Sequence, residues 1–450
     1  MDITLRIPEA ALHHLLDTVL IPRMVRVRYV APTPEAIDDI PQAVARELRR
    51  REIASLVRPG ERVAIGVGSR GIGGLPEIVS ALVRELRAAG CDPFIIPTMG
   101  SHGGANAEGQ LEVLRHLGVT PERIGAAIRS QMETVIVGTT PGGTPVHVDR
   151  LAAEADAIVM VTRVKPHTAF RGPYESGLAK MIAIGLGKQV GAATIHARGF
   201  GEMSHMIPQA TEVALDRAPI RFGLAILENA HDQPYKIVAA PANRILSDEP
   251  ALLEEAKSAM PSLPYARFDV LIIDRIGKNI SGDGADPNIT GRYPTPYASG
   301  GPEISKQVVL DLSDASGGNA NGIGMADFTT VRFVRKMDLG RTYPNALTST
   351  VPRPVAIPMV LPSDRLAIAA ALLTCNAVGR EPRLVRIQDT LHLESFSVSA
   401  SMLGDVESDL HQHVDSAPES LHFDPHGDLV DLKPDAPQPL VAGASNADSW

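Results

Sequence analysis

Ionisable side chains are interleaved with glycines between residues 165 and 202, a stretch that contains His167, Lys180 and His196. It follows an apolar run, residues 156–164, that is typical of a buried strand. In α/β proteins ligands bind where strands end in glycine-rich turns, because the backbone can approach a ligand there and the next helix offers free N–H groups. This stretch is therefore the first candidate for a functional site.

Lys180 lies within an apolar run, residues 177–184, that makes its amine hard to solvate. Desolvation lowers the pKa of a lysine from about 10.4 and favours the nucleophilic amine. The alternative is a side chain that extends to the surface, and we predict this for Lys188, which lies in a more polar turn. His196 has no Cys or carboxylate at ligand spacing, so spacing alone does not predict a metal ligand there.

Three glycines, Gly66, Gly68 and Gly71, form a GxGxxG pattern between a predicted strand and a predicted helix. This is the context of a dinucleotide site, but the Asp or Glu expected at the end of the next strand is missing, because that strand ends at Pro97. The loop is therefore weakly supported as a binding site for a nicotinamide cofactor. It is better supported as an anion-binding loop, with Arg70 in the turn. A structural turn remains the alternative.

His102 follows the next predicted strand and is surrounded by glycines. Because parallel strands end at one edge of a sheet, we expect Arg70, His102 and His167 to face a single crevice. A loop histidine that only contacts solvent is the alternative.

The composition, with 44% hydrophobic and 21% charged residues, is that of a soluble globular protein. A net charge of −9 argues against nucleic acid and anionic membranes as partners. No signal peptide or membrane-spanning run is present, which predicts a cytoplasmic protein. The two cysteines, Cys91 and Cys375, are too few for a disulfide framework and are predicted to be buried thiols.

A chain of 450 residues predicts two domains. Strands and helices alternate, so we predict an α/β fold with a Rossmann-like, largely parallel sheet in residues 1–263 and a smaller α/β domain in residues 264–431. Pro261 and Pro264 mark the boundary, and the active site is expected between the domains. Residues 432–450 are predicted to be disordered.

The ionisable residues of the first domain, taken together, resemble those of the nickel-dependent lactate racemase family and its paralogues. The matching residues are Arg70 in GSRG, His102 in MGSHGG, His167 in KPHTAFRG, Lys180 in SGLAK and His196 in ATIHARG. The resemblance implies that Lys180 is the attachment point of a nickel-pincer nucleotide, pyridinium-3-thioamide-5-thiocarboxylic acid mononucleotide, and that His196 is the nickel ligand. It also implies His102 and His167 as acid/base groups, and cofactor contacts at Gly68, Ser69 and Arg70.

Such a protein would invert the 2-hydroxy carbon of a small anionic 2-hydroxy carboxylate. Removing the α-hydrogen as a proton beside a carboxylate would create a poorly stabilised dianion, so reversible hydride transfer is easier, with histidines moving the hydroxyl proton. This chain departs from the family at Gly66 and Val67, where an acidic pair is usual, and in extra residues around 171–174. We therefore expect a substrate other than lactate. The predicted substrate contacts are Arg171, Lys278, Asn288 and Arg292.

Two other functions remain open from the sequence. One is an NAD-dependent 2-hydroxy acid dehydrogenase that uses Gly66 to Gly71, and the other is a non-catalytic nucleotide or carboxylate sensor. The expected protein partners of the racemase are the enzymes that make its cofactor. Assembly into a homo-oligomer is left open.

Overall fold

The computed structural model describes residue 7, residues 9–69 and residues 71–432. Contacts divide the chain into two units. Of the described residues, the N-terminal unit spans Thr33–Met260, and the C-terminal unit combines those up to Pro32 with residues 261–432. Both units are mixed α/β structures, which confirms the predicted fold class.

The N-terminal unit is built on a five-stranded sheet in the order β3-β2-β6-β7-β8. The first four strands of this order are parallel, and β8 is antiparallel to β7. The strands read as near-continuous apolar runs because helices cover both faces of the sheet. Their bounds are β2 (Arg62–Val67), β3 (Asp92–Pro97), β6 (Ala157–Arg163), β7 (Ile220–Glu228) and β8 (Pro234–Pro241).

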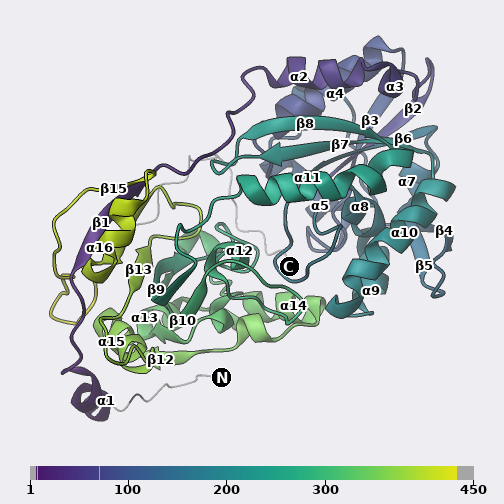
Figure 1. The fold of residues 1–450 in the computed structure, drawn as a ribbon. Coiled ribbons are helices and arrows are strands. Elements are labelled where there is room, and N and C mark those ends of the chain that lie inside the picture. Colours follow the sequence, from purple (N-terminus) through teal and green to yellow (C-terminus); the bar gives the residue numbers. More distant parts are fainter. Residues whose placement is uncertain (1–6, 8, 70, 433–450) are drawn as a thin grey trace. The chain divides into compact units, whose positions relative to one another are not determined.

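Two apolar cores lie on the two faces of this sheet. Ile65 packs with Leu82 and the other buried residues of one face, whereas Met160 packs with Ile182 and Ile207 on the other. In Figure 1, α11 runs alongside β7 and β8. The helices are α2 (Ile40–Leu48), α3 (Arg51–Ala54), α4 (Leu75–Ala88), α5 (Ala107–His116), α6 (Pro121–Ile124), α7 (Arg150–Ala153), α10 (Met203–Arg217) and α11 (Ile245–Ala259).

The stretch after β6 forms an irregular helical segment. It consists of α8 (Leu178–Lys180), a turn of π-helix, η1 (Met181–Gly185), and α9 (Lys188–His196). Single π-turns occur often at functional sites. An antiparallel hairpin precedes β6 and consists of β4 (Thr134–Thr139) and β5 (Pro145–Asp149).

The C-terminal unit contains an eight-stranded sheet in the order β12-β11-β10-β9-β13-β14-β1-β15. The strands from β12 to β13 in this order are parallel, and the remaining neighbours are antiparallel. Their bounds are β1 (Met24–Tyr29), β9 (Arg267–Ile276), β10 (Glu303–Leu312), β11 (Phe328–Thr330), β12 (Met359–Leu361), β13 (Leu384–Ile387), β14 (Ser395–Ser399) and β15 (Gln412–Val414). The helices are α1 (Glu9–Leu16), α12 (Pro287–Thr290), α13 (Val331–Lys336), α14 (Leu339–Ser349), α15 (Asp364–Thr374) and α16 (Leu403–Ser408).

Strand β1 lies in a different unit from the one expected. The sequence prediction assigned residues 1–263 to one domain, but Val27 of β1 pairs with Phe396 of β14 and with Val414 of β15. The apolar alternation of β1 supplies a strand whose partners come from the far end of the chain. The tail after Leu432, predicted to be disordered, lies outside the described residues.

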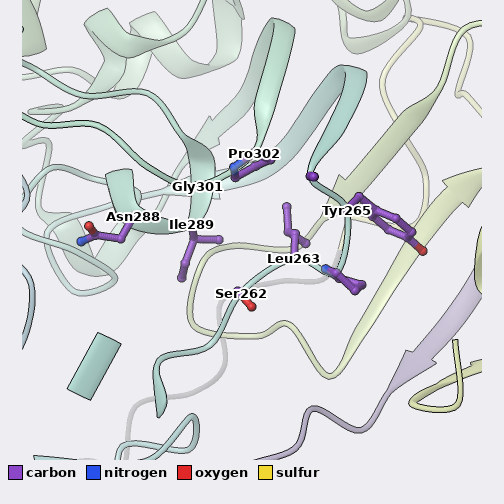
Figure 2. A pocket seen from close by; sticks show the side chains of 9 residues that line it. Ser262, Leu263, Tyr265, Asn288, Ile289, Gly301 and Pro302 are labelled. Carbon is purple, nitrogen blue, oxygen red and sulfur yellow. The ribbon is translucent and has the colours of Figure 1, made fainter. Parts of the chain in front are cut away.

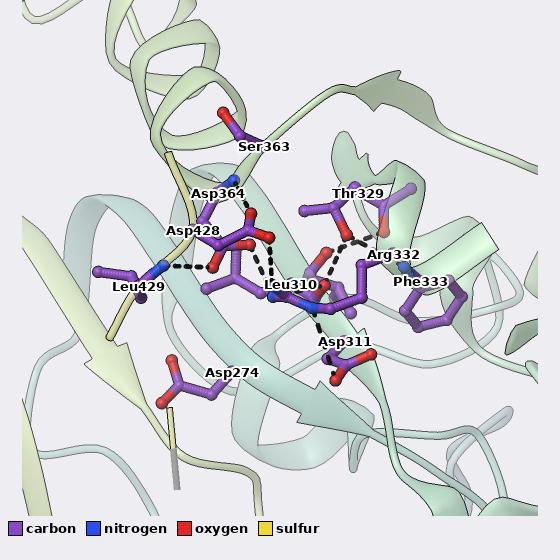
Figure 3. A network of polar contacts seen from close by, with 12 residues as sticks. Asp274, Leu310, Asp311, Thr329, Arg332, Phe333, Ser363, Asp364, Asp428 and Leu429 are labelled. Atoms are coloured by element: carbon purple, nitrogen blue, oxygen red, sulfur yellow. Dashed lines mark hydrogen bonds and ion pairs between the residues drawn. The ribbon is translucent and has the colours of Figure 1, made fainter. Parts of the chain in front are cut away.

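A network of charged side chains ties the helices of the C-terminal unit to its sheet (Figure 3). Arg332 of α13 donates to the fully buried Asp364 of α15 at 2.7 Å and lies 3.1 Å from Asp428 and 3.6 Å from Asp311. Three carboxylates offset the cost of removing one guanidinium from water. The network is therefore structural.

Two further observations concern the chain as a whole. Cys91 and Cys375 are both buried and free, as predicted. Among the described residues, the helices are too short or too polar for any of them to cross a bilayer.

Candidate functional site

The loops after β2 and β3 both pack against the helical segment of residues 178–196. A Cβ atom on Gly68 would lie 2.6 Å from Cε of Met181, and one on Gly100 would lie 3.3 Å from Cβ of Ala192. The N–H of Gly100 also donates to the carbonyl of Gly185 at 3.3 Å. Gly100 has a φ of 60°, a conformation that favours glycine, and the missing side chain of Gly68 leaves room for Met181. The glycine-rich loops therefore bring two strand ends against the segment that carries Lys180.

The first two loops also meet each other. Oγ of Ser69 is hydrogen-bonded to Nδ1 of His102, whose side chain is exposed. Arg70 lies outside the described residues. The expectation that strand-end loops converge at one sheet edge therefore agrees with the placement of Ser69 and His102.

His167, Lys180 and His196 lie within electrostatic reach of one another. Burial, followed by the charge of Lys180, holds the pKa of His167 well below its usual range. Burial and the same lysine lower the pKa of His196 to about 4. The Phe200 ring lies beside both imidazoles, with centroids 6.2 Å and 6.0 Å away. Both histidines are therefore neutral near pH 7.

A break in the helix explains how Lys180 and His196 come together. In an unbroken α-helix, residues sixteen positions apart would be separated by about 24 Å along the axis. The chain instead changes direction after η1, where Lys188 has a φ of 54°. Because only this change of direction allows the two side chains to interact, residues 186–188 are part of the architecture of the site.

The hydrogen bonds of His167 define which ring nitrogen carries the proton. The N–H of Ala169 donates to Nδ1 of His167 at 3.0 Å. A neutral imidazole that accepts at Nδ1 is protonated at Nε2. In this orientation His167 presents an N–H donor at Nε2, and it can accept a proton there only after the Ala169 bond is exchanged.

Glu175 fixes the loop that carries His167. Its buried carboxylate accepts from the N–H of His167 at 2.8 Å and from Arg171 at 3.0 Å, and it lies 3.0 Å from Nζ of Lys257. Arg171 in turn donates to the carbonyl of His167 at 2.6 Å. The residues around 171–174, whose role the sequence left unexplained, therefore form a turn that Glu175 closes on the histidine.

These contacts bear on the predicted role of Arg171. Its guanidinium is a quarter exposed and is hydrogen-bonded to protein groups of its own loop, so it braces His167. A contact between Arg171 and a substrate stays a prediction. Sequence reasoning missed Glu175, and its only signal was a carboxylate within a glycine-rich, largely uncharged run.

Glu249 of α11 is a second buried carboxylate that sequence reasoning missed. It accepts from the N–H groups of Ala179 at 2.9 Å and of Leu178, at the start of the helical segment that carries Lys180. A Cβ atom on Gly177 would lie 2.6 Å from its Oε1. Burial, opposed by these two hydrogen bonds, raises the pKa of Glu249 to about 7.

Lys188 does not reach the surface, so that prediction was wrong. Its side chain is fully buried and forms an ion pair with Asp149 at 2.9 Å. The glycine-rich, apolar turn before it packs into the core and leaves no path to solvent, so the amine is stabilised by an internal carboxylate instead.

The GxGxxG pattern does not occupy the geometry of a dinucleotide site. Gly66 lies inside β2, where its missing side chain makes room for Met160 and Thr98, each within 2.8 Å of a Cβ atom placed there. Helix α4 starts only at Leu75. In the dinucleotide fingerprint the first glycine forms the turn and the helix follows at once, so this loop favours the racemase interpretation over a nicotinamide site.

The predicted substrate residues of the second domain lie in the C-terminal unit and serve local structure there. Lys278 donates to the carbonyl of Gly282 at 2.6 Å, and Arg292 forms an ion pair with Asp327 at 3.0 Å. Asn288 lines a cavity of about 340 Å³, together with Tyr265 and seven other residues (Figure 2). Their contact with a substrate stays a prediction.

The donor set around Lys180 fits the cofactor implied by the resemblance. A neutral imidazole is a suitable ligand for nickel, and the low pKa of His196 keeps it neutral. Within the described residues, no group of three or more His, Cys, Asp or Glu side chains is arranged to hold a metal.

Comparison with known proteins agrees with this geometry. Residues 10–206 match the family model of the lactate racemase N-terminal domain. This part of the chain is similar to a lactate racemase N-terminal domain. The match includes β1 and all the predicted site residues of the N-terminal unit, and it confirms the resemblance to the lactate racemase family.

Solved structures show that the likeness extends beyond the lactate racemase N-terminal domain. The lactate racemase apoprotein from Thermoanaerobacterium thermosaccharolyticum superposes with a TM-score of 0.51 at 15% identity, covering 82% of this chain and 98% of that chain. The fold is thus shared over both units. A protein from Thermotoga maritima has a TM-score of 0.46 at 14% identity, covering 73% of this chain and 84% of that chain. No curated protein matches the sequence.

Proposed function

We propose that the protein is a racemase or epimerase that inverts the 2-hydroxy carbon of a 2-hydroxy carboxylate. The observation that carries the proposal is the grouping of Lys180 with His167 and His196 in a lactate racemase N-terminal domain. Lys180 is half-buried beside two imidazoles that remain neutral. This arrangement suits an amine that is modified covalently and a nitrogen donor that binds a metal.

In this proposal, Lys180 would carry the covalent link to a nickel-pincer nucleotide and His196 would bind its nickel. When bound, the nucleotide supplies a hydride acceptor for the α-hydrogen. Ser69 and Gly68 line the loop that faces the same helical segment, which supports the expected cofactor contacts. Arg70, between them and α4, would add a cation for the phosphate.

The two histidines would move the hydroxyl proton. If His102 donates from Nδ1 to Ser69, its Nε2 carries the lone pair that would accept that proton. His167 presents a donor at Nε2, which suits the carboxylate or the oxygen of a bound acid. Inversion in both directions would require His167 to accept a proton at Nε2 as well as donate one. For this, the proton must move to Nδ1, and the hydrogen bond from Ala169 to Nδ1 must break. Lactate is not the expected substrate, because Glu175 and Arg171 occupy the extra turn beside His167.

The decisive experiment is the intact mass of the protein after co-expression with the enzymes that make the cofactor. We expect a covalent mononucleotide adduct that is lost in Lys180→Ala and kept in Lys165→Ala, the matched control from the same stretch. The adduct-bearing protein should racemise a member of a 2-hydroxy acid panel, with deuterium at C2 retained rather than exchanged with solvent. Racemisation by protein of unmodified mass would contradict the proposal.

The NAD-dependent dehydrogenase is the second candidate, because a GxGxxG sequence is present. It predicts reduction of NAD by a 2-hydroxy acid and full tolerance of Lys180→Ala. The strand position of Gly66 opposes it. Nicotinamide turnover without an adduct would nevertheless establish it, whereas a carboxylate sensor would bind the acid without turning it over.

A further inference from the structure

A buried polar relay connects Lys188 to the loop of His102. We propose that Lys188, acting through Gln110, is a positioning residue that holds the His102 loop against the segment carrying Lys180 and His196. The inference deepens the proposed function and rests on it for the role of His102. The contacts themselves are independent of that role.

Lys188 joins three elements from within the core. Its Nζ lies 2.9 Å from Oδ2 of Asp149 at the end of β5, and it donates to the carbonyl of Pro97 at 2.6 Å at the end of β3. Its third partner is Oε1 of Gln110 on α5, at 3.3 Å. Burial lowers the pKa of Lys188, and the carboxylate of Asp149 opposes this shift.

The Asp149 side of this pair is also fixed. Its Oδ1 accepts from Nε2 of Gln131 at 2.9 Å and from the N–H of Ala152 at 3.2 Å. Because Asp149 is held by two donors of its own, it provides a rigid anchor for the lysine. Lys188 therefore fixes the side chain of Gln110 relative to the end of β5.

Gln110 passes this constraint to the loop. Its side-chain nitrogen donates to the carbonyls of Gly100 at 3.0 Å and of His102 at 3.3 Å. An amide has one acceptor end and one donor end, so contact of the oxygen with Lys188 turns the donors toward these carbonyls. Without the lysine the amide could flip and set oxygen against oxygen.

The loop needs an external constraint because its own sequence supplies little. Gly100, Gly103 and Gly104 have φ values of 60°, 66° and 65°, and Ala105 has a φ of 52°. Glycines in this region leave many conformations open in the absence of contacts. The two hydrogen bonds from Gln110 select one of them, which places His102 near Ser69.

The test separates the relay from the general stability of the core. Gln110→Leu removes the donors to the loop and leaves the Lys188–Asp149 pair intact, whereas Lys188→Met removes the origin of the relay. Lys236→Met is the control, because it breaks an ion pair with Glu255 at 2.6 Å elsewhere in the same unit. Each variant is compared with the unmodified full chain by hydrogen exchange and by NMR titration of the His102 ring.

In Gln110→Leu we expect the amides of Gly100 and His102 to exchange about tenfold faster, while α9 is unchanged. The His102 titration should shift, and kcat should fall about 10- to 100-fold with little change in KM. Lys236→Met should alter none of these. If loop exchange and the His102 titration are unchanged in Gln110→Leu, the inference is wrong. Hydrogen exchange and the His102 titration do not depend on enzymatic activity, so a failure of the racemase proposal would be detected separately. If Lys188→Met does not fold, the result for Gln110→Leu decides the test.

Discussion

The backbone N–H of His167 donates to the buried carboxylate of Glu175 at 2.8 Å. The same carboxylate binds Arg171 and Lys257, so one anion joins the His167 loop to α11. A buried carboxylate that accepts from the backbone and pairs with two cations is costly to remove, because its buried donors are left without an acceptor. The position of His167 therefore depends on a residue eight positions further along the chain.

Substitution of this carboxylate should destabilise the protein. We expect Glu175→Ala to lower the free energy of unfolding by about 2–3 kcal/mol, because two backbone donors, of His167 and Gly172, lose their acceptor and two cations lose an ion-pair partner. Lys257→Met, which keeps the bond to His167, should cost less. Urea unfolding measures both, and equal losses in the two variants would show that the bond to His167 contributes little.

Glu249 should make stability depend on pH. Its pKa is about 7 in the folded protein because of burial, and it returns to about 4.3 on unfolding. The folded state thus binds the proton more tightly, so this contribution to stability is complete below pH 4 and is lost as the pH rises through 7.

The variant Glu249→Gln removes that dependence while keeping an oxygen to accept from Ala179 and Leu178. We expect it to be about 1–2 kcal/mol more stable than the parent at pH 8 and to lose this advantage at pH 5. Thermal unfolding at the two pH values gives the comparison. A constant difference between them would mean that Glu249 does not titrate in this range.

The close approaches of Gly68 and Gly185 predict losses of stability of different size for the same substitution. In Gly185→Ala the new Cβ would lie 2.7 Å from the backbone oxygen of Thr98, which cannot move away. We expect a loss of about 1–3 kcal/mol. In Gly68→Ala it meets only the terminal methyl of Met181, which can rotate, so the loss should stay below about 1 kcal/mol. Denaturant midpoints of the two purified variants test the order.

Removal of either proton-transfer histidine should lower the racemisation rate but leave the covalent cofactor adduct at Lys180 in place. His102→Ala and His167→Ala are each expected to lose about 100- to 10,000-fold in racemisation rate, while intact mass still shows modification at Lys180. His205→Ala is the matched control, since that side chain is exposed on α10. Full activity in either variant would remove that residue from the mechanism.

The sequence predicted features that follow from local patterns. The apolar runs of β2, β3, β6 and β7 identified the parallel sheet, and the glycine-rich loops after β2 and β3 identified the edge where Ser69 meets His102. The spacing of apolar residues and the positions of glycine and proline are local properties of the sequence. They therefore predict strands and turns without knowledge of the fold.

Features that depend on distant partners could not be predicted in this way. Lys188 was expected at the surface because its neighbours are polar, yet its partner Asp149 lies thirty-nine positions earlier and shares the core with it. Glu249 likewise caps a helix about seventy residues away. A buried charge is recognisable only when its counterion is known, and a single sequence does not reveal that pairing.

The strand β1 gives the molecule an unusual chain path. Residues 9–32 belong to the C-terminal unit, and the chain leaves this unit after Pro32 and returns to it at Pro261, so residues 33–260 are an insertion within it. That inserted piece is one continuous length of chain with its own two cores. We expect this piece to fold when it is expressed by itself, whereas a truncated protein that begins at Thr33 would leave the eight-stranded sheet with β15 separated from β14.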